Sequence, residues 1–130
     1  MDISIFLKSL ADSDTAPIVI CDKEHNIVYM NPTADEHYKK WGGAELVGKS
    51  IFSCHNSHSV EKIKKVVDWF SENPQNNRIF TYHNPTQNKD VYMIALRNEN
   101  GELIGYYEKH EYRNAETANL YDFLKKHESP

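Results

Sequence analysis

The sequence has few of the residues that mark a specialised class of protein. Cys21 and Cys54 are its only cysteines, and because no export signal precedes them we expect reduced thiols and no disulfide framework. The N-terminus, Met1–Ser4, lacks the basic flank of a secretory signal. The longest apolar runs, Pro17–Cys21 and Tyr92–Leu96, are far shorter than the roughly 20 residues that cross a bilayer. These absences predict a water-soluble, cytoplasmic protein that has no membrane segment.

An excess of positive charge is also missing. The chain has 15 Lys and Arg residues against 19 Asp and Glu residues, a formal net charge of −4. Lys62, Lys64 and Lys65 lie close together, but no stretch combines clustered basic residues with interleaved aromatic ones. Because phosphate binding depends on concentrated positive charge, nucleic acid is not an expected partner. A chain of 130 residues has room for one hydrophobic core and not for two.

Helical spacing of apolar residues is present near both ends of the chain. Ile3, Phe6, Leu7 and Leu10 follow the i, i+3, i+4, i+7 pattern of an amphipathic helix, which the polar cluster at Asp12–Asp14 would end. A second set of apolar residues near the other terminus predicts a C-terminal helix followed by a tail: Ala118, Leu120, Tyr121, Phe123 and Leu124.

Two more helices are predicted in the middle of the chain. Thr33 can cap a short helix that runs to Trp41, because Gly42-Gly43 follows it. The best-defined helix begins near Ser57–Ser59 and is stopped by Asn73-Pro74. One of its faces is apolar, with Val60, Ile63, Val66, Val67 and Phe70.

Two strand-like runs precede the central helices, and three follow them. They are Ile18–Cys21, Ile27–Met30, Arg78–His83, Val91–Leu96 and Leu103–Glu108. This order favours one antiparallel sheet with the helices gathered on one face, an α+β fold. We therefore divide the chain into an N-terminal flanking helix (1–14), a central domain (15–112) and a C-terminal helix and tail (113–130).

The order of these elements and the residues at their joints resemble the PAS domain family over Thr15–Glu111. In that family the second strand typically ends in apolar-apolar-Tyr-x-Asn-x-Ala, and a later turn reads Glu-Leu-Val/Ile-Gly-Lys. Here the corresponding segments are Ile27–Ala34 and Glu45–Ser50, with Asn100-Gly101 before the last strand. Asn31 can bond local backbone where a strand turns into a helix, and Gly48 can adopt a backbone angle closed to other residues. The segment Gly48–Asn56 is similar to a PAS subgroup that carries Cys-His just before the long helix.

The resemblance implies a five-stranded antiparallel sheet curled around a pocket between the sheet and the central helices. It also implies a sensory or signalling module that binds a small ligand or a protein partner, and a homodimer formed through the flanking helices. PAS modules usually sit beside an effector domain, for which 130 residues leave no room. We therefore expect the signal to pass through the terminal helices to a signalling protein partner in trans.

The segment Cys54–His58 holds the densest set of chemically active side chains. His55 and His58 would share a helix face if the helix begins early, and the positive end of a helix favours a neutral, metal-binding imidazole. Some PAS domains bind haem through a histidine on or near this helix. The resemblance thus implies a candidate haem site, with His55 or His58 as the axial ligand of the iron and Cys54 beside it. The alternative is that one histidine bonds locally and the other is solvated.

A small enzyme that uses Cys54 as its nucleophile is a further alternative. Adjacent residues seldom bring sulfur and imidazole within hydrogen-bond reach, and Asn56 is not spaced to orient such a pair. A small, partly buried thiol is the simpler interpretation. We therefore predict no catalytic residue and no enzymatic activity.

The last three strands supply the remaining candidate ligand contacts, Tyr82, Met93 and Tyr106. Their tyrosines make the predicted pocket more polar than a sealed core, which favours a bound small molecule. Strict alternation would put Phe80 and Tyr82 on the same side of their strand. The sequence alone does not determine which side of that strand faces the pocket.

Overall fold

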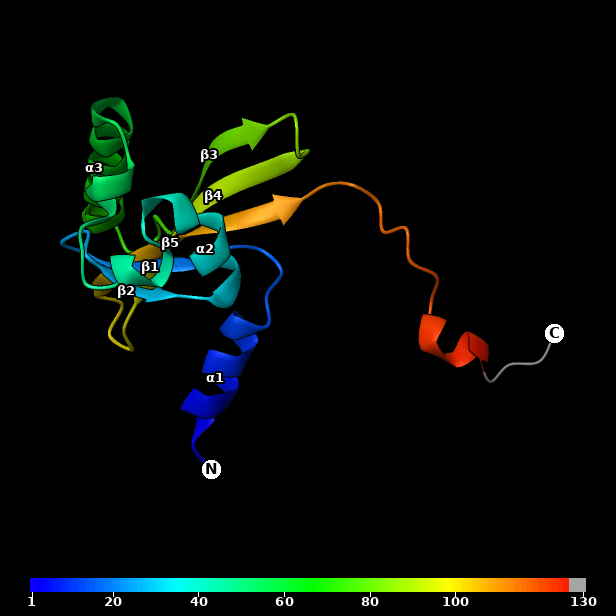
Figure 1. The fold of residues 1–130 in the computed structure, drawn as a ribbon. Coiled ribbons are helices and arrows are strands. Elements are labelled where there is room, and N and C mark those ends of the chain that lie inside the picture. The colour runs from blue at the N-terminus through cyan, green and yellow to red at the C-terminus, as the bar shows by residue number, and fades with distance from the viewer. Residues whose placement is uncertain (127–130) are drawn as a thin grey trace.

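A computed structural model describes residues 1–126, and its centre is one five-stranded antiparallel sheet (Figure 1). The strands are β1 (Val19–Asp22), β2 (Ile27–Met30), β3 (Arg78–Asn84), β4 (Lys89–Arg97) and β5 (Leu103–Tyr112). Their order across the sheet is β2-β1-β5-β4-β3. The predicted α+β fold and the five-stranded sheet are thereby confirmed. No helix among the described residues is long and apolar enough to span a bilayer.

The central helices and turns cover one face of the sheet. They are α2 (Pro32–His37), three 3-10 turns (Lys39–Trp41, Gly43–Leu46 and Ile51–Cys54) and α3 (Ser57–Glu72). The predicted long helix is confirmed, and its apolar residues Ile63, Val67 and Phe70 are buried against the sheet. Asn56 caps its start, because the Asn56 side-chain oxygen accepts a hydrogen bond from the Ser59 amide at 2.8 Å.

Asn31, and not Thr33, caps the shorter helix. The Asn31 side-chain oxygen accepts from the Ala34 amide at 2.8 Å and from the Ile18 amide at 2.9 Å. Thr33 instead donates its hydroxyl to the Asp14 carbonyl at 2.9 Å. The helix is also shorter than predicted, because α2 ends at His37 and a separate 3-10 turn continues to Trp41.

The strand register determines which side chains face the helices. In β4 and β5, opposite residues lie on the same face of the sheet, so Met93 pairs with Glu108, Val91 with His110 and Lys89 with Tyr112. Cys21 pairs with Tyr106, which joins β1 to the same surface. The central strands therefore present both apolar and ionisable residues to the helical layer.

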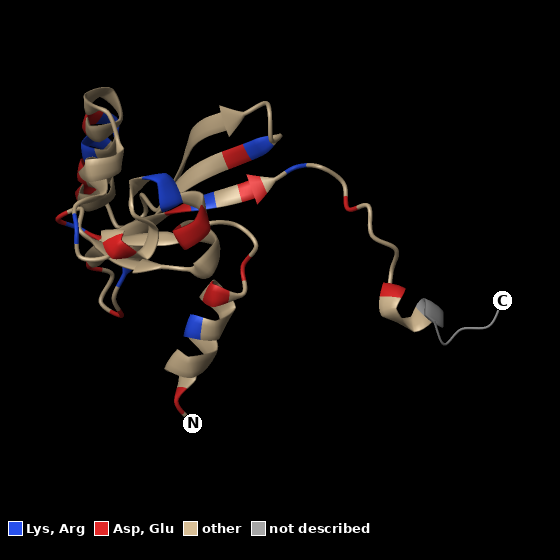
Figure 2. Ribbon diagram, viewed as in Figure 1, with Lys and Arg blue, Asp and Glu red and all other residues tan. Residues whose placement is uncertain are grey.

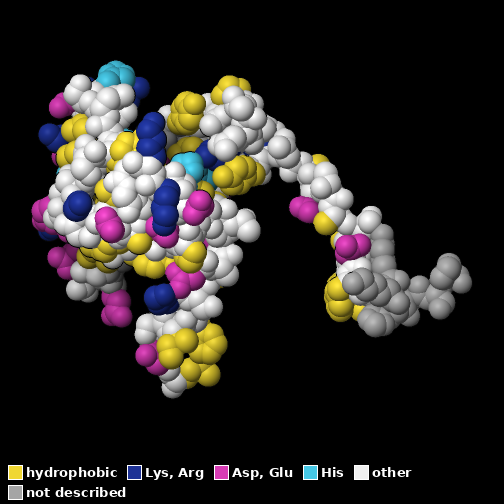
Figure 3. All heavy atoms as spheres, viewed as in Figure 1, with side chains coloured by type: hydrophobic (Ala, Val, Ile, Leu, Met, Phe, Trp, Pro, Cys, Tyr) yellow, Lys and Arg dark blue, Asp and Glu magenta, His cyan; other side chains and the backbone are white. Residues whose placement is uncertain are grey.

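The N-terminal helix lies apart from this core (Figure 1). It is α1 (Ile3–Asp12), and none of its residues is buried. Its predicted apolar positions, Ile3, Phe6, Leu7 and Leu10, are all more than half exposed, and the space-filling view shows apolar side chains gathered near its free end (Figure 3).

No C-terminal α-helix forms in the part of the segment 113–130 that the structure describes. The chain runs away from the domain as an extended arm that carries one 3-10 turn, Asp122–Lys126 (Figure 1). Leu120, Tyr121 and Phe123 are exposed there, so the predicted helix has no surface of the domain against which to fold. Residues 127–130, the end of the predicted helix and tail, lie outside the described residues.

Candidate functional site

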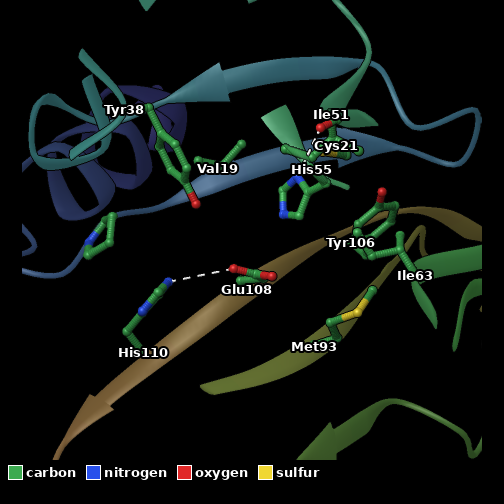
Figure 4. A pocket seen from close by; sticks show the side chains of 11 residues that line it. Val19, Cys21, Tyr38, Ile51, His55, Ile63, Met93, Tyr106, Glu108 and His110 are labelled. Carbon is green, nitrogen blue, oxygen red and sulfur yellow. Dashed lines mark hydrogen bonds and ion pairs between the residues drawn. The ribbon is translucent and has the colours of Figure 1, made fainter. Parts of the chain in front are cut away.

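A small cavity lies between the sheet and the helical layer (Figure 4). Its volume of about 20 Å³ is enough for one water molecule. Its walls are lined by Pro17, Val19, Cys21, Tyr38, Ile51, His55, Ile63, Met93, Tyr106, Glu108 and His110. The His55 ring and the Glu108 carboxyl point into it from opposite walls (Figure 4).

A much larger groove adjoins this cavity, between α3 and the strands β3, β4 and β5. Its volume is about 680 Å³, within the range of roughly 300–1,000 Å³ that is usual for small-molecule sites. The groove and the cavity share the lining residues His55, Ile63, Met93, Glu108 and His110. Apolar and histidine side chains are visible in the hollow between α3 and the β3–β4 hairpin (Figure 3).

Glu108 and His110 form the polar centre of both spaces. They are two residues apart on β5 and therefore lie on the same face of the sheet. His110 Nε2 lies 3.8 Å from Glu108 Oε2. Burial raises the pKa of the Glu108 carboxyl, whereas His55 and Lys89 act in the opposite direction. Burial lowers the pKa of His110 to about 4, and the neighbouring Lys89 and His37 add to that shift. His110 Nδ1 is buried and has no hydrogen-bond partner within residues 1–126.

Lys89 is the third ionisable residue of the groove and is 4% exposed. It forms no ion pair with any carboxylate of residues 1–126, and its ammonium lies 5.5 Å from the centre of the Tyr112 ring. Burial lowers its pKa, although the negative charge of Glu108 acts in the opposite direction. A buried ammonium without a paired anion is costly, so this lysine is poised for an anionic partner.

The two candidate haem ligands are separated in the structure. His55 precedes α3, and its Nδ1 lies 3.0 Å from the Ile51 carbonyl, an arrangement that leaves Nε2 directed into the cavity. His58 is exposed on the first turn of α3 and lines neither space. The two residues do not share a helix face, because α3 begins only at Ser57. Within residues 1–126, no three histidine, cysteine or acidic side chains converge as a metal site.

Cys54 lies closer to His55 than expected, with its sulfur 3.5 Å from His55 Nδ1. Both groups, however, contact the same acceptor, because the Cys54 sulfur is 3.2 Å from the Ile51 carbonyl. Burial raises the pKa of the Cys54 thiol, and burial raises that of Cys21 to about 12. Both environments favour the neutral thiol over the nucleophilic thiolate, and Cys54 lines neither the cavity nor the groove.

The three candidates on the strands all line the site. Met93 and Tyr106 are 3% exposed, and the Tyr106 hydroxyl lies 2.8 Å from His25 Nδ1. Tyr82 lines the rim of the groove. A bulge in β3 at Thr81 separates it from Phe80, because Phe80 pairs with Tyr92 and Tyr82 pairs with Val91. Phe80 and Tyr82 therefore do not share a face, which corrects the strict alternation predicted for this strand.

Glu108, His110 and Lys89 are absent from the candidate contacts that the sequence analysis names. A signal was available for two of them. Glu108 and His110 lie two and four residues after Tyr106, so alternation along β5 places all three on one face. Lys89 gave no such signal, because a lysine at the start of a strand is normally solvated.

Comparison with known proteins identifies the family. A family model described as "PAS domain" matches residues 15–108. The chain belongs to the PAS domain family. Comparison with curated proteins gave no match.

Solved structures of other PAS domains show the same fold. The PAS domain of a protein from Colwellia psychrerythraea has 15% sequence identity and a TM-score of 0.63, and 86% of this chain and 98% of that chain are covered. The PAS domain of Bordetella pertussis BvgS has 19% identity, a TM-score of 0.59, and coverage of 97% and 94%. The Aer2 receptor from Vibrio cholerae, described as a dual PAS-heme oxygen sensor, has 23% identity, a TM-score of 0.52, and coverage of 75% and 94%.

Proposed function

We propose that this PAS domain is a sensory module that binds a small molecule in the groove between α3 and β3–β5 and signals to a separate protein. PAS domains are generally sensory and not catalytic, and both thiols here are held in neutral form, so we propose no enzymatic activity. The observation that carries the proposal is the groove itself. It combines about 680 Å³ of space with apolar walls and a few ionisable groups that converge at its base.

A chain of contacts connects the groove to the N-terminal helix. His37 lines the groove at the end of α2. Asn31 caps the other end of α2, and its side-chain amide donates to the Ala11 carbonyl of α1 at 3.0 Å. The Tyr29 hydroxyl also donates to the Asp12 carboxylate of α1. A ligand that displaces His37 would therefore act on α1 through a six-residue helix that is capped by a buried side chain.

The output requires a partner, which we propose to be a signalling protein in trans. The exposed apolar side of α1 supports a homodimer, because four large apolar residues that are more than half exposed gain free energy when a second copy covers them. Charged residues of both signs are interspersed over the elements (Figure 2), which does not favour nucleic acid as a partner. The cytoplasmic location stays a prediction.

Denaturing mass spectrometry of the purified protein tests the proposal. We expect a small molecule to be released from the wild-type domain. We expect Val66→Trp, which fills the groove from α3, to remove that molecule. Val28→Trp places the same side chain on β2 outside the groove, at a residue that is 52% exposed, and serves as the control. If nothing is released from the wild type, the protein does not carry a bound small molecule and the proposal is contradicted. If Val66→Trp retains the molecule, the groove is not the binding site.

The haem alternative fits these residues poorly. His55 offers a suitably held imidazole and lines both the cavity and the groove. Its ring, however, points into the cavity, which admits about one water molecule, and the Glu108 carboxyl lies across from it. His58 faces solvent. An absorbance spectrum before and after addition of haemin decides between the two proposals. We expect no Soret band, and a band at one haem per chain that is lost in His55→Ala would establish the alternative.

A further inference from the structure

We propose that the ligand of the groove is a small monocarboxylic acid with an apolar body, whose carboxylate pairs with Lys89. This inference rests on the proposed function, because it names the chemical class of the molecule that the groove binds. It is carried by the side chains of the groove and by their unsatisfied interactions.

Lys89 provides the first observation. It is 4% exposed, and the Tyr112 ring near its ammonium is a weak substitute for a counter-ion. Burying a charged group is tolerated when an opposite charge and hydrogen bonds replace the lost water. Within residues 1–126 the chain supplies no carboxylate in ion-pair contact with Lys89. Because Lys89 lines the groove, a bound anion can supply one.

The orphaned nitrogen of His110 provides the second observation. The His110 side chain is 7% exposed, and its Nδ1 has no partner within residues 1–126. His37 lies beside it, with the two ring centres 6.5 Å apart. A carboxylate has two acceptor oxygens, so it can pair with the lysine and accept from an imidazole N–H at the same time. The unsatisfied groups of the groove are thus of the kind that a carboxylate satisfies.

The balance of charge in the groove excludes an amine. Its lining includes the three lysines Lys62, Lys65 and Lys89 but only one acidic residue, Glu108. A cationic ligand would be repelled by the lysines, whereas an anion is attracted by all three. Glu108 limits the charge of that anion, because the second negative charge of a phosphate would lie close to its carboxyl group. Burial raises the pKa of Glu108, so this residue readily takes up a proton and can donate it to a carboxylate oxygen.

Apolar side chains determine the remainder of the ligand. The aliphatic side chains and the methionine that line the groove are Ile63, Val66, Ile79, Val91 and Met93. A carboxylate alone would leave most of the 680 Å³ unfilled. The wall composition therefore favours an aliphatic or aromatic body of drug-like size attached to the carboxylate.

Calorimetric titration with octanoate and with 1-octanol tests this inference. The two probes have the same chain length and differ in the charged head group. We expect the wild-type domain to bind one octanoate per chain at least about tenfold more tightly than octanol. Lys89→Met keeps the side-chain length and removes the charge, so it should abolish the preference. The matched control is Lys109→Met on β5, which lies opposite Tyr92 and is absent from the groove, and it should keep the preference.

Thermal denaturation shows whether the Lys89→Met variant is folded. Removal of an unpaired buried ammonium should raise the melting temperature of the ligand-free Lys89→Met protein. If Lys89→Met does not fold, Lys89→Gln is used in its place. Val66→Trp should block octanoate binding, and Val28→Trp should not, which places the probe in the groove.

Three outcomes would overturn the inference. They are equal binding of octanoate and octanol, a preference for octanoate that persists in Lys89→Met, and no binding of octanoate at all. None of them removes the proposed function, which depends on the release of a small molecule from the wild type and its loss in Val66→Trp.

Discussion

At the scale of single residues, the ionisable groups of the groove are shifted toward their neutral forms. Burial raises the pKa of the Glu108 carboxyl and lowers that of the His110 imidazole to about 4. The same cause lowers the pKa values of Lys89 and His37. Lys89 and the His110 side chain are buried, the Glu108 side chain is 34% exposed and His37 is exposed, and all four groups line one space. Such a space is suited to bind a polar group of a ligand strongly.

The shifted pKa of His110 makes the stability of the domain depend on pH. The unfolded chain takes up this proton near the ordinary value of 6.5, whereas the folded chain does so only at about 4. The unfolded state therefore binds more protons between these values, so stability falls as pH falls through this window. We expect the wild type to lose about 2–3 kcal/mol of unfolding free energy between pH 7 and pH 4 through this group. Urea denaturation of the wild type and His110→Gln at both pH values measures it.

Glu108 opposes this trend, because a raised carboxyl pKa makes the folded state gain a proton first as the pH falls. His110→Gln retains Glu108, Lys89 and His37, so the difference between the two proteins isolates the histidine. A difference that does not change with pH would contradict the buried, neutral state of His110.

At the scale of elements, the close pairing of β1 with β5 depends on Gly105. A Cβ at this position would lie 2.1 Å from the Cys21 carbonyl oxygen of the neighbouring strand. Because that oxygen belongs to backbone, it cannot move aside as a flexible side chain could. The strand pair that brings Tyr106 and Glu108 to the site therefore requires glycine here.

We expect Gly105→Ala to lower the unfolding free energy by about 3 kcal/mol. Gly101 is the matched control, since a Cβ there would meet nothing within 4 Å and only its φ of 80° opposes a side chain. Gly101→Ala should therefore cost about 1–2 kcal/mol. Chemical denaturation of both variants provides the comparison, and equal losses would show that the close approach of β1 and β5 is not what Gly105 serves.

Elements that depend on periodicity and local breakers could be predicted from the sequence. The apolar spacing of α3 and the Asn73-Pro74 breaker gave the helix and its end, and the order of strands gave the sheet. The joint at Asn31 was recognised as a backbone-bonding position, but Thr33 was assigned the cap. Asn31 takes this role because its amide group satisfies the start of α2, the start of β1 and the end of α1 at once, a set of long-range contacts that no local pattern contains.

The site was less predictable, because shifts of one or two residues in a helix start or a strand register decide which side chains face it. Whether His55 and His58 share a face depends on a helix start that differs by about two residues, and the faces of Phe80 and Tyr82 depend on one bulge. The polar centre depends on the convergence of Lys89, Glu108 and His110 in one groove, which is decided by the packing of helices over strands. Sequence reasoning thus named Met93, Tyr106, Tyr82 and His55 but not Lys89, Glu108 and His110.

At the scale of the whole molecule, the surface of α1 remains without a partner in the single chain. Ile3, Phe6, Leu7 and Leu10 are 61%, 55%, 56% and 70% exposed. The other side of the same helix is mainly polar, with Lys8 paired to Asp12 at 2.6 Å, and Ile5 is the large apolar residue on that side, 69% exposed. This division favours a contact with a second α1 in a homodimer.

We expect the wild type to sediment as a dimer and Leu7→Glu to weaken the dimer at least about tenfold, because a charge would be buried in the contact. Ser9→Glu introduces the same charge in α1 outside the apolar set and should leave the dimer intact. Sedimentation velocity over a range of concentrations makes the comparison. A monomeric wild type, or equal behaviour of both variants, would contradict the dimer.

Hydrogen exchange at α1 is the most direct test of a sensory role, because it measures whether a ligand bound in the groove changes the protection of amides outside the groove. The released small molecule is removed from the wild type by unfolding and refolding, and is then added back. We predict that it changes the exchange rates of amides in residues 3–12 as well as those in α3 and β3–β5. Changes confined to the groove, with α1 unaffected, would contradict signalling through the N-terminal helix and leave a domain that binds its ligand without transmitting it.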